Sequence, residues 1–574
     1  MRIIDYYNWG ALGILSLLVL LTIFKKNKGF FCNSSVSSLL LQLDNKLNNG
    51  SLQHIAFFLL LGLGIFLRFY RLAVLPEGLH QDEASNSYEA FSLANFGIDR
   101  NGYPYPVYPI TWGSGGGSPV LIYLYALICK FVNPSVFSYR FIFAFFGSLT
   151  LVLFYFFLKN ILGVKVALLG LGILSLTPWH IIISRWGLDS NTIPFWCMII
   201  LLLFYFAQHT QKTAYYILTA AFCAVILYCY GSATFVMPIF VLLSCGYCLW
   251  LKKMTFRQLF FSGIAFIIVV FPLAVFYFIN VFDLPAIVTA VFSVPRFTGS
   301  HTDTVFISFD KNLPLTLVKN LLHLLTMMTI GVQDELWNYM PGYFTLYHFT
   351  FPITFLGLGV CFYQVWQGLK RKEFHSHCFM VFMFLSAFLT ALFMKQNINR
   401  IIFIFLPMVY FMAVGFLILK KASPLFLTLA LMVFLLGGAS FTKDYFTVYG
   451  PMSNYLFMKG YGDAISYAEM IREEDQQIYS TYENLASPFI TALLYSRTSP
   501  HDYLETARYK DEDAEFRVAS SFTYYTFGLP EDIEDDKYLE HIIIIENSER
   551  ERFENLGYEM TTFGNFTVLK AGLP

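Results

Sequence analysis

The chain has 574 residues, of which 56% are hydrophobic and only 13% are charged, whereas a soluble domain carries about 25% charged residues. This composition excludes an ordinary soluble enzyme, a disordered chain and a small disulfide-rich scaffold. The formal net charge is zero, but residues 445–574 contain 23 acidic and 10 basic residues, against 15 acidic and 28 basic residues before them. The sequence therefore predicts a basic membrane-embedded body and an acidic tail in water. The basic residues lie in loops between apolar runs, which argues against binding of nucleic acid.

About twelve apolar runs predict membrane-spanning helices, because a helical span needs about 20 largely apolar residues. The runs lie at 11–24, 54–72, 136–158, 163–183, 192–208, 214–230, 233–251, 258–280, 346–369, 376–394, 400–420 and 424–441, and several are short. Two further runs, 119–132 and 315–331, are interrupted by polar or charged residues, and we expect them to lie on the external membrane surface. The predicted fold class is a polytopic α-helical membrane protein with a C-terminal soluble α/β domain.

Residues 1–53 are predicted to form an N-terminal anchor and a cytoplasmic linker, residues 54–441 a transmembrane domain and residues 442–574 an extracytoplasmic domain. Clusters of Lys and Arg follow every second apolar run, and the positive-inside rule places those loops in the cytoplasm. The opposite loops and the tail are then external. Within the tail, residues 463–472, 487–495 and 549–556 have helical patterns, whereas 477–481, 516–524, 541–546 and 565–569 have strand patterns.

The first external loop contains the acidic pair Asp82 and Glu83, about ten residues after a predicted span. Neighbouring carboxylates on a turn point in different directions, so one can act on a substrate while the other supports the site. A carboxylate close to low-dielectric lipid can also be tuned as a general base. The alternative is a pair of acids that only stabilises the start of a helix, since residues 85–96 have a helical pattern.

Cations at the predicted outer surface indicate a site for a phosphate-bearing ligand. Arg185 lies in the turn that also contains Asp189, and Lys395 and Arg400 flank another short external loop, against the positive-inside trend. A guanidinium can bind a phosphate with two parallel hydrogen bonds. The alternatives are an interfacial anchor for Arg185 and an Arg400 side chain that only reaches out of the membrane to water. Nucleotide-binding and zinc-protease motifs do not occur in the sequence.

In their order and spacing, these motifs resemble the GT-C superfamily of membrane glycosyltransferases, and within it the branch of protein O-mannosyltransferases and aminoarabinose transferases. The resemblance covers about residues 54–420 and rests on His80-Gln81-Asp82-Glu83, a Gly-rich run ending in Ser118-Pro119, Tyr139-Arg140, Thr177-Pro178-Trp179-His180, Ser184-Arg185 with Asp189, and Asn399-Arg400. It implies a GT-C-like catalytic domain with external interfacial helices. The extra residues 1–53 and a tail without MIR repeats leave the acceptor open.

The resemblance implies a glycosyltransferase in the cell membrane that moves a sugar from a polyprenyl-phosphate-linked donor to an acceptor glycan, lipid or protein, by inverting single displacement on the external face. It implies that Asp82 is the base, that Glu83 supports it and that Asp189 helps to position the acceptor or a metal ion. The predicted donor phosphate site consists of Arg185, Arg400 and Lys395, and the predicted further substrate contacts are His80, Tyr103 and His301. No metal-ligand set is predicted from the residues, although the resemblance allows a divalent cation.

Three other classes of protein share parts of this pattern. A lipid-linked-sugar transporter or flippase fits the number of spans, but transporters carry ionisable residues within their spans, and such residues are nearly absent here. A non-catalytic membrane scaffold would need only to present the acidic tail. A polymerase or ligase of surface polysaccharide shares the topology, but its key residues usually lie in a different long external loop.

Overall fold

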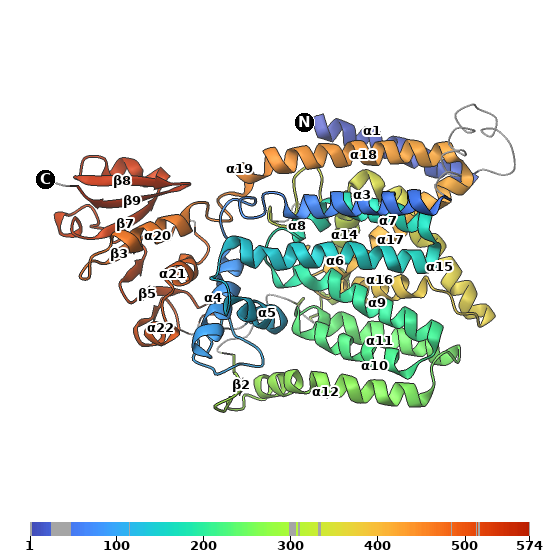
Figure 1. Cartoon of the computed structure of the whole chain (residues 1–574), viewed down its shortest axis with the longest axis horizontal. Coiled ribbons are helices and arrows are strands. Elements are labelled where there is room, and N and C mark those ends of the chain that lie inside the picture. Colours follow the sequence, from blue (N-terminus) through green and yellow to red (C-terminus); the bar gives the residue numbers. More distant parts are fainter. Residues whose placement is uncertain are drawn as a thin grey trace.

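The structure is a computed structural model that describes residues 3–24, 48–113, 115–297, 306–307, 310–330, 335–483, 485–512, 514 and 517–572. A bundle of long helices makes up most of the molecule, and a smaller domain with a β-sheet lies at one end of the bundle (Figure 1). The chain passes from the bundle into this domain after α18, so the tail predicted from the charge distribution is a separate layer of the fold.

Each of the twelve predicted apolar runs forms a helix of the bundle. These helices are α1 (Ile3–Phe24), α3 (Gly50–Phe69), α6 (Val136–Leu162), α7 (Val164–Leu176), α9 (Ile193–Thr210), α10 (Thr213–Val225), α11 (Ala233–Trp250), α12 (Phe256–Val281), α15 (Phe351–Arg371), α16 (Cys378–Leu392), α17 (Phe405–Ala422) and α18 (Pro424–Thr447). Among the residues with described positions, nine helices are long and apolar enough to cross a membrane, and α7, α10 and α16 are shorter. The chain is therefore a multi-pass membrane protein, as predicted.

Burial divides the bundle into inner and outer helices. Of the candidate membrane segments, the one containing α17 is 89% buried, whereas those of α3 and α12 are only 11% and 17% buried. Apolar side chains on α12, such as Ile268 and Phe271, are 66% and 62% exposed. An exposed face this apolar is stable in lipid and not in water, so α3 and α12 are outer helices that face the lipid.

Short elements connect the long helices. The α-helices among them are α4 (Gln81–Phe96), α5 (Pro119–Cys129), α8 (Pro178–Ile183) and α14 (Leu313–Thr329), and the 3-10 helices are η1 (Asp189–Thr192), η2 (Ile226–Tyr228), η3 (His348–Thr350) and η4 (Ile402–Ile404). Strands β1 (Ile287–Val288) and β2 (Ser293–Val294) form a small antiparallel hairpin after α12. Helices α4 and α5 and strand β2 lie at the end of the bundle that faces the C-terminal domain (Figure 1).

The two helices predicted to lie on the membrane surface do not cross the bundle. Helix α5 has 11 residues and is about 16 Å long, roughly half of the apolar thickness of a bilayer. Helix α14 is held beside the end of α16, because the Asn320 side chain donates to the carbonyl oxygens of Leu392 and Met394 at 2.8 and 3.1 Å. Beyond α14, Trp337 contacts the ring of His80, so the chain has returned to the same end of the bundle.

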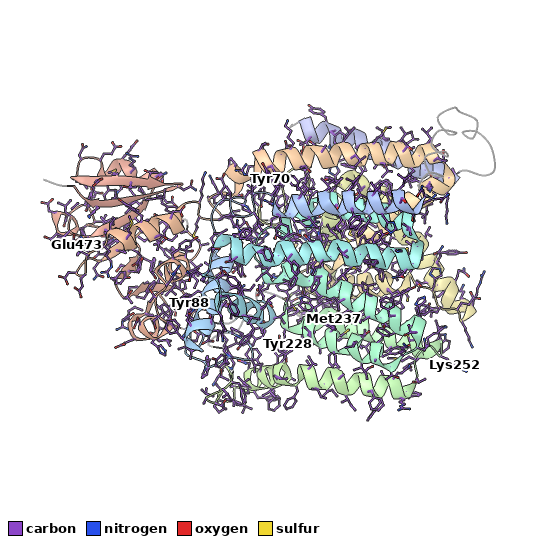
Figure 2. The ribbon with its side chains drawn as sticks, in the orientation of Figure 1. Tyr70, Tyr88, Tyr228, Met237, Lys252 and Glu473 are labelled. Atoms are coloured by element: carbon purple, nitrogen blue, oxygen red, sulfur yellow. The ribbon has the colours of Figure 1, made fainter. Side chains whose placement is uncertain are left out.

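The basic loops and the C-terminal domain lie at opposite ends of the molecule. Lys252, in the basic loop between α11 and α12, marks one end, and Glu473 in the C-terminal domain marks the other (Figure 2). The N-terminus lies toward the same end as the C-terminal domain (Figure 1). This arrangement agrees with the alternation of basic loops in the sequence.

The C-terminal domain is an α/β domain, as predicted. Helix α19 (Tyr449–Ser453) connects the bundle to this domain, and its Tyr449 packs in the core of the bundle. The helices of the domain are α20 (Tyr461–Ile471), α21 (Pro488–Ser496), α22 (Pro500–Thr506), η5 (Asp536–Tyr538) and η6 (Asn547–Phe553), and its strands are β3 (Ile478–Ser480), β4 (Arg508–Tyr509), β5 (Ala519–Phe522), β6 (Tyr525–Phe527), β7 (Ile542–Glu546), β8 (Tyr558–Phe563) and β9 (Phe566–Ala571). The sheet has the order β4-β5-β6-β3-β7-β9-β8, with β3 parallel to β6 and β7 and the other pairs antiparallel.

Helix α4 belongs to the core of the C-terminal domain as well as to the bundle. Leu79, Ala84 and Tyr88 are buried in one hydrophobic cluster with residues of α20, α21 and the sheet. The Tyr88 hydroxyl donates to the carbonyl oxygen of Thr498 at 2.8 Å. Figure 2 shows Tyr88 at the junction of the two parts. The C-terminal domain is therefore packed against the helix that carries the predicted catalytic acids.

Candidate active site

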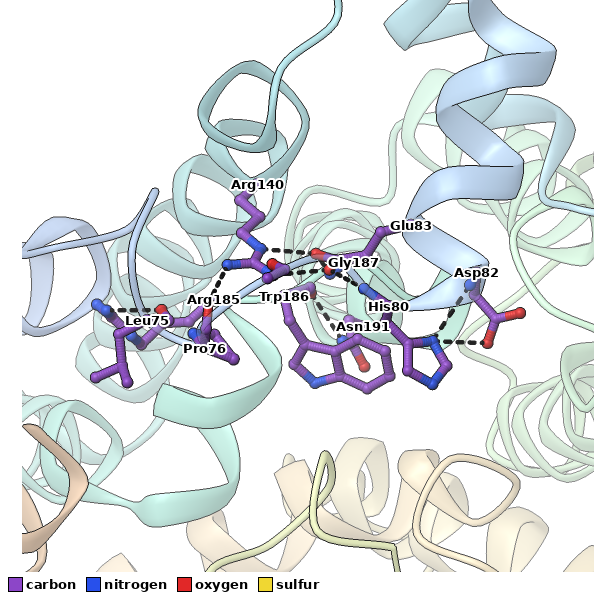
Figure 3. A network of polar contacts seen from close by, with 11 residues as sticks. Leu75, Pro76, His80, Asp82, Glu83, Arg140, Arg185, Trp186, Gly187 and Asn191 are labelled. Carbon is purple, nitrogen blue, oxygen red and sulfur yellow. Dashed lines mark hydrogen bonds and ion pairs between the residues drawn. The ribbon is translucent and has the colours of Figure 1, made fainter. Parts of the chain in front are cut away.

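Asp82 is positioned by the first turn of α4. His80 is the N-cap residue: its Nδ1 accepts from the main-chain N–H of Asp82 at 3.2 Å, and its own N–H donates to Glu83 Oε2 at 3.0 Å. Such a capping box supplies partners to N–H groups that have none within the helix. The box turns Glu83 toward the protein interior and leaves Asp82 beside it on the open side (Figure 3).

Glu83 is fully buried and joins three segments of the chain. Both of its oxygens accept from the guanidinium of Arg140 at 2.8 Å, and Oε1 also accepts from the N–H of Gly187 at 2.8 Å. Arg140 donates further to the carbonyl oxygens of Pro76 and Gly78, both at 2.7 Å. Glu83 therefore has its oxygens occupied by protein donors, a geometry that fits the supporting position expected for it.

A cavity of about 1060 Å³ lies beside α4 and brings three of the predicted residues together. Asp82, Asp189 and Arg400 line this cavity, and Arg296 and Asp283 line it as well. The charges of Asp82 and Asp189 are close enough to interact. Residues more than 300 positions apart in the chain thus line one cavity of a size that takes an organic ligand.

Asp189 is held rigidly at the start of η1. Its Oδ1 accepts from the Asn86 side chain of α4, and its Oδ2 accepts from the main-chain N–H of Ser118, both at 2.8 Å. The Gly-rich run before α5 is needed for this approach, since a Cβ atom on Gly117 would lie 2.3 Å from Asn86 Oδ1. Gly117 therefore allows the α4–α5 loop to lie against Asn86, so that the N–H of Ser118 reaches Asp189.

The surroundings of Asp82 and His80 set their protonation. Confinement in the cavity raises the pKa of Asp82, while the nearby His80 and Trp112 side chains lower it by less. Burial among the rings of Trp186, Trp337 and Phe457 lowers the pKa of His80. A neutral His80 accepts at Nδ1 from the Asp82 N–H, so it leaves the Asp82 carboxylate, 3.4 Å from that nitrogen, available to a ligand.

The short loop after α16 places one of its two cations at the cavity. The guanidinium of Arg400 lines the cavity and donates to the carbonyl oxygen of Lys395 at 2.9 Å. The loop is fixed to α14, because the Gln396 side chain donates to the carbonyl oxygen of Asn320 at 3.0 Å. Lys395 itself is exposed and is not among the residues that line the cavity.

Three predicted residues are not brought to the cavity. Arg185 is buried beneath α4, where its guanidinium donates to carbonyl oxygens at the end of α3, at 2.9 Å from Leu67 and 2.7 Å from Tyr70, and stacks on Tyr445 and Phe446. Tyr103 lies in the loop after α4, with its main-chain N–H bonded to Asp99, and it does not line the cavity. His301 lies outside the described residues.

The cavity also contains polar groups that the sequence did not single out. Arg296 is paired with Asp283 at 2.7 Å, and both lie on the cavity wall. In the described part of the chain, the buried oxygens Ser85 Oγ, Ser232 Oγ and Asn399 Oδ1 line the cavity without a hydrogen-bond partner. Unpartnered buried oxygens are costly unless a ligand or water satisfies them. A serine or an arginine in a loop carries no sequence signal of this kind, since its partners are distant in the chain.

A metal site in the described part of the structure would need several ligand side chains close together. No group of three or more His, Cys, Asp or Glu side chains there lies close enough together to hold a metal ion. Asp82 and Asp189 are two carboxylates in one cavity, and both oxygens of Asp189 already accept hydrogen bonds.

The comparisons with known proteins identify the fold. Residues 116–277, which include Arg140 and Asp189, match the family described as dolichyl-phosphate-mannose-protein mannosyltransferase. ArnT from Cupriavidus metallidurans in the apo state is 13% identical, with a TM-score of 0.53, and the match covers 89% of this chain and 97% of ArnT. The chain has the GT-C fold. The resemblance to GT-C glycosyltransferases expected from the motifs is thus confirmed.

Two further solved structures have lower TM-scores with the chain. ArnT from Cupriavidus metallidurans bound to undecaprenyl phosphate is 12% identical, with a TM-score of 0.49, over 89% of this chain and 97% of ArnT. The archaeal oligosaccharyltransferase AglB from Archaeoglobus fulgidus, in complex with an inhibitory peptide and a dolichol-phosphate, is 12% identical, with a TM-score of 0.45, over 86% of this chain and 69% of AglB. No curated protein matches the chain in sequence.

Proposed function

We propose that this protein is a glycosyltransferase that moves a sugar from a polyprenyl-phosphate-linked donor to an acceptor on the external face of the membrane. The observation that carries the proposal is the shared cavity of Asp82, Asp189, Arg296 and Arg400 at one end of a membrane bundle. A lipid-linked phosphate cannot leave the bilayer, so its sugar is presented at this depth. Such a transfer needs a base for the acceptor and positive charge for the leaving phosphate, and one cavity here holds both carboxylates and guanidiniums.

The transfer is a single displacement at the anomeric carbon. The acceptor oxygen forms a bond to that carbon, and the bond from carbon to the phosphate oxygen breaks with its electron pair leaving on the phosphate. Asp82 takes the proton of the acceptor hydroxyl, and its raised pKa makes it a stronger base than an ordinary aspartate. Because the acceptor enters opposite the leaving group, the configuration is inverted.

The leaving phosphate needs positive charge and not a proton. Arg400 and Arg296 are the guanidiniums that line the cavity, and a guanidinium stabilises phosphate charge by bidentate hydrogen bonds. Asp189, fixed by Asn86 and Ser118, positions the acceptor beside Asp82. Arg185 and Lys395 are not part of this proposed donor site, because neither lines the cavity.

The family match and the orientation support the same proposal. The name of the matched family specifies a dolichyl-phosphate sugar as donor and a protein as acceptor. The C-terminal domain and the cavity lie at the end opposite the basic loops, which the positive-inside rule assigns to the cytoplasm. We infer that residues 54–441 form the catalytic domain and that both the cavity and residues 442–574 are extracytoplasmic. Labelling of an Asn101→Cys variant by a membrane-impermeant maleimide in intact cells tests this orientation.

The proposal is tested in a strain that lacks this protein, complemented with wild type, Asp82→Asn or Asp502→Asn. Mass spectrometry of surface glycans should show a sugar that wild type restores and Asp82→Asn does not, since loss of a general base lowers rates by about 10²–10⁴-fold. Asp502, an exposed acid of the C-terminal domain, is the matched control and should restore the sugar fully. Restoration by Asp82→Asn at equal membrane abundance would show that the proposal is wrong.

A further inference from the structure

Trp112 connects the candidate base to the C-terminal domain. It lies in the loop between α4 and α5 and lines the cavity together with Asp82. Its ring also packs against the hydrophobic cluster shared by α4 and the C-terminal domain. A residue that belongs to the wall around the base and packs on the other domain at once can transmit the position of one to the other.

Trp112 is held by one contact from the C-terminal domain and by Arg100, which follows α4 in the chain. The main-chain N–H of Arg517, just before β5, donates to the Trp112 carbonyl oxygen at 3.2 Å. The guanidinium of Arg100 lies 5.8 Å from the centre of the Trp112 ring and 5.8 Å from the centre of the Phe489 ring in α21. Arg100 therefore lies against two aromatic rings, one from each part of the protein, within the range of cation–π attraction.

Arg100 is fixed in this position by buried partners. Its Nε lies 3.4 Å from Oε1 of Glu89, its main-chain N–H donates to Glu89 Oε2 at 3.0 Å, and its guanidinium donates to the Thr111 carbonyl oxygen. Arg100 is 4% exposed and Glu89 is fully buried. A desolvated cation interacts with an aromatic face more strongly than an exposed one. The geometry thus favours a rigid support over a mobile surface contact.

We propose that Arg100 and Phe489 are positioning residues that hold Trp112 against Asp82, so that the C-terminal domain forms part of the active-site support. This inference rests on the proposed function, since it takes Asp82 as the base. It gives the C-terminal domain a role in catalysis through position, without direct contact with a substrate. It also explains why α4 is shared between the two parts of the fold.

The effect of Trp112 on Asp82 supplies a readout that folding alone does not change. Trp112 in the cavity wall lowers the pKa of Asp82, so its displacement raises that pKa and leaves the base protonated up to a higher pH. The acid limb of kcat/KM should then move to higher pH by up to about one unit. The other charged or titratable groups that face Asp82 or line its cavity are His80, Glu83, Tyr108, Asp189, Tyr230, Tyr277, Asp283, Arg296 and Arg400.

The experiment measures the pH profile of transfer by full-length Phe489→Ala, Arg100→Lys and Trp112→Phe variants. The donor is the one that wild type uses from a panel of undecaprenyl-phosphate-linked mannose, glucose and aminoarabinose, and the acceptor is membranes of the strain lacking the protein. All three variants should move the acid limb upward with little change in donor KM, and Phe489→Tyr, which keeps the ring, should not. Phe566→Ala is the matched control, because Phe566 is equally buried in the C-terminal domain but packs on Tyr461.

The outcomes separate this inference from the proposed function. An unmoved acid limb in Phe489→Ala and Arg100→Lys, or an equal shift in Phe566→Ala, would overturn the positioning role while leaving Asp82 as the base. The double variant Trp112→Phe with Phe489→Ala should move the acid limb by the same amount as Trp112→Phe alone. That result would support the inference that Phe489 acts on Asp82 through Trp112. Normal transfer by Asp82→Asn, or no transfer by wild type from any donor of the panel, would overturn the proposed function and this inference with it.

Discussion

The two neighbouring acids of the first external loop should fail in different ways when each is neutralised. In Glu83→Gln, the buried guanidinium of Arg140 loses its counter-ion. The new amide NH₂ group, itself a donor, also faces N–H groups whose hydrogen bonds the carboxylate accepted. Breaking one side of a buried ion pair costs about 3–5 kcal/mol. We therefore expect Glu83→Gln to unfold at a clearly lower temperature than wild type.

Asp82→Asn provides the matched comparison for this measurement. The Asp82 side chain is 26% exposed, and its pKa is raised, so its ionised form costs folding free energy at any pH above that pKa. Neutralising it should leave the unfolding temperature unchanged or slightly higher. Thermal unfolding of the detergent-solubilised variants, followed by size-exclusion chromatography, measures both. Unfolding of Glu83→Gln at the wild-type temperature would refute the supporting role of this ion pair.

Three further predictions concern the cavity. Arg400→Ala should raise the KM for the lipid-linked donor by about 10–100-fold with a smaller change in kcat, because it removes a charge-assisted contact to phosphate. Lys395 is exposed and does not line the cavity, so Lys395→Ala should change the donor KM by less than about threefold. A donor titration of both variants distinguishes these outcomes. The rate of transfer should fall as the pH drops through the raised pKa of Asp82. The acid limb of kcat/KM should therefore lie at a pH above the ordinary aspartate pKa of about 4. An acid limb at or below that pH would contradict the confinement of this carboxylate. Gly117→Ala should lower kcat by about tenfold or more while the protein stays folded, because the Cβ atom of the new alanine would displace Asn86 from Asp189. An unchanged kcat would show that the contact between Asn86 and Asp189 is not needed.

Hydropathy was sufficient to predict the helical bundle and the position of the acidic pair. Membrane helices form from local apolar runs, and the start of α4 at Gln81 follows from residues that cap it. The tail was predicted less well where local patterns compete. Residues 516–524 read as one strand, but within the described residues β5 covers only Ala519–Phe522 of that range, and a turn separates it from β6, which begins at Tyr525. The predicted helix at 549–556 is the 3-10 helix η6.

The partners of charged residues could not be predicted, because they depend on contacts between distant segments. Arg185 has the sequence context of a phosphate ligand, yet the end of α3 presents carbonyl oxygens that need donors, and Arg185 supplies them. Arg296 has no motif around it, and only the folding of the long loop brings it to the cavity. The support of α4 by the C-terminal domain depends on residues more than 370 positions apart, such as Tyr88 and Thr498.

The most direct test of the central claim is the rate of sugar transfer by purified protein from an undecaprenyl-phosphate-linked donor, with wild type and Asp82→Asn compared at equal folded fraction. Asp82 as the base predicts a rate at least about 100-fold lower in the variant, with inverted configuration in the wild-type product. A variant rate close to that of wild type would contradict the assignment of this cavity as the site of transfer.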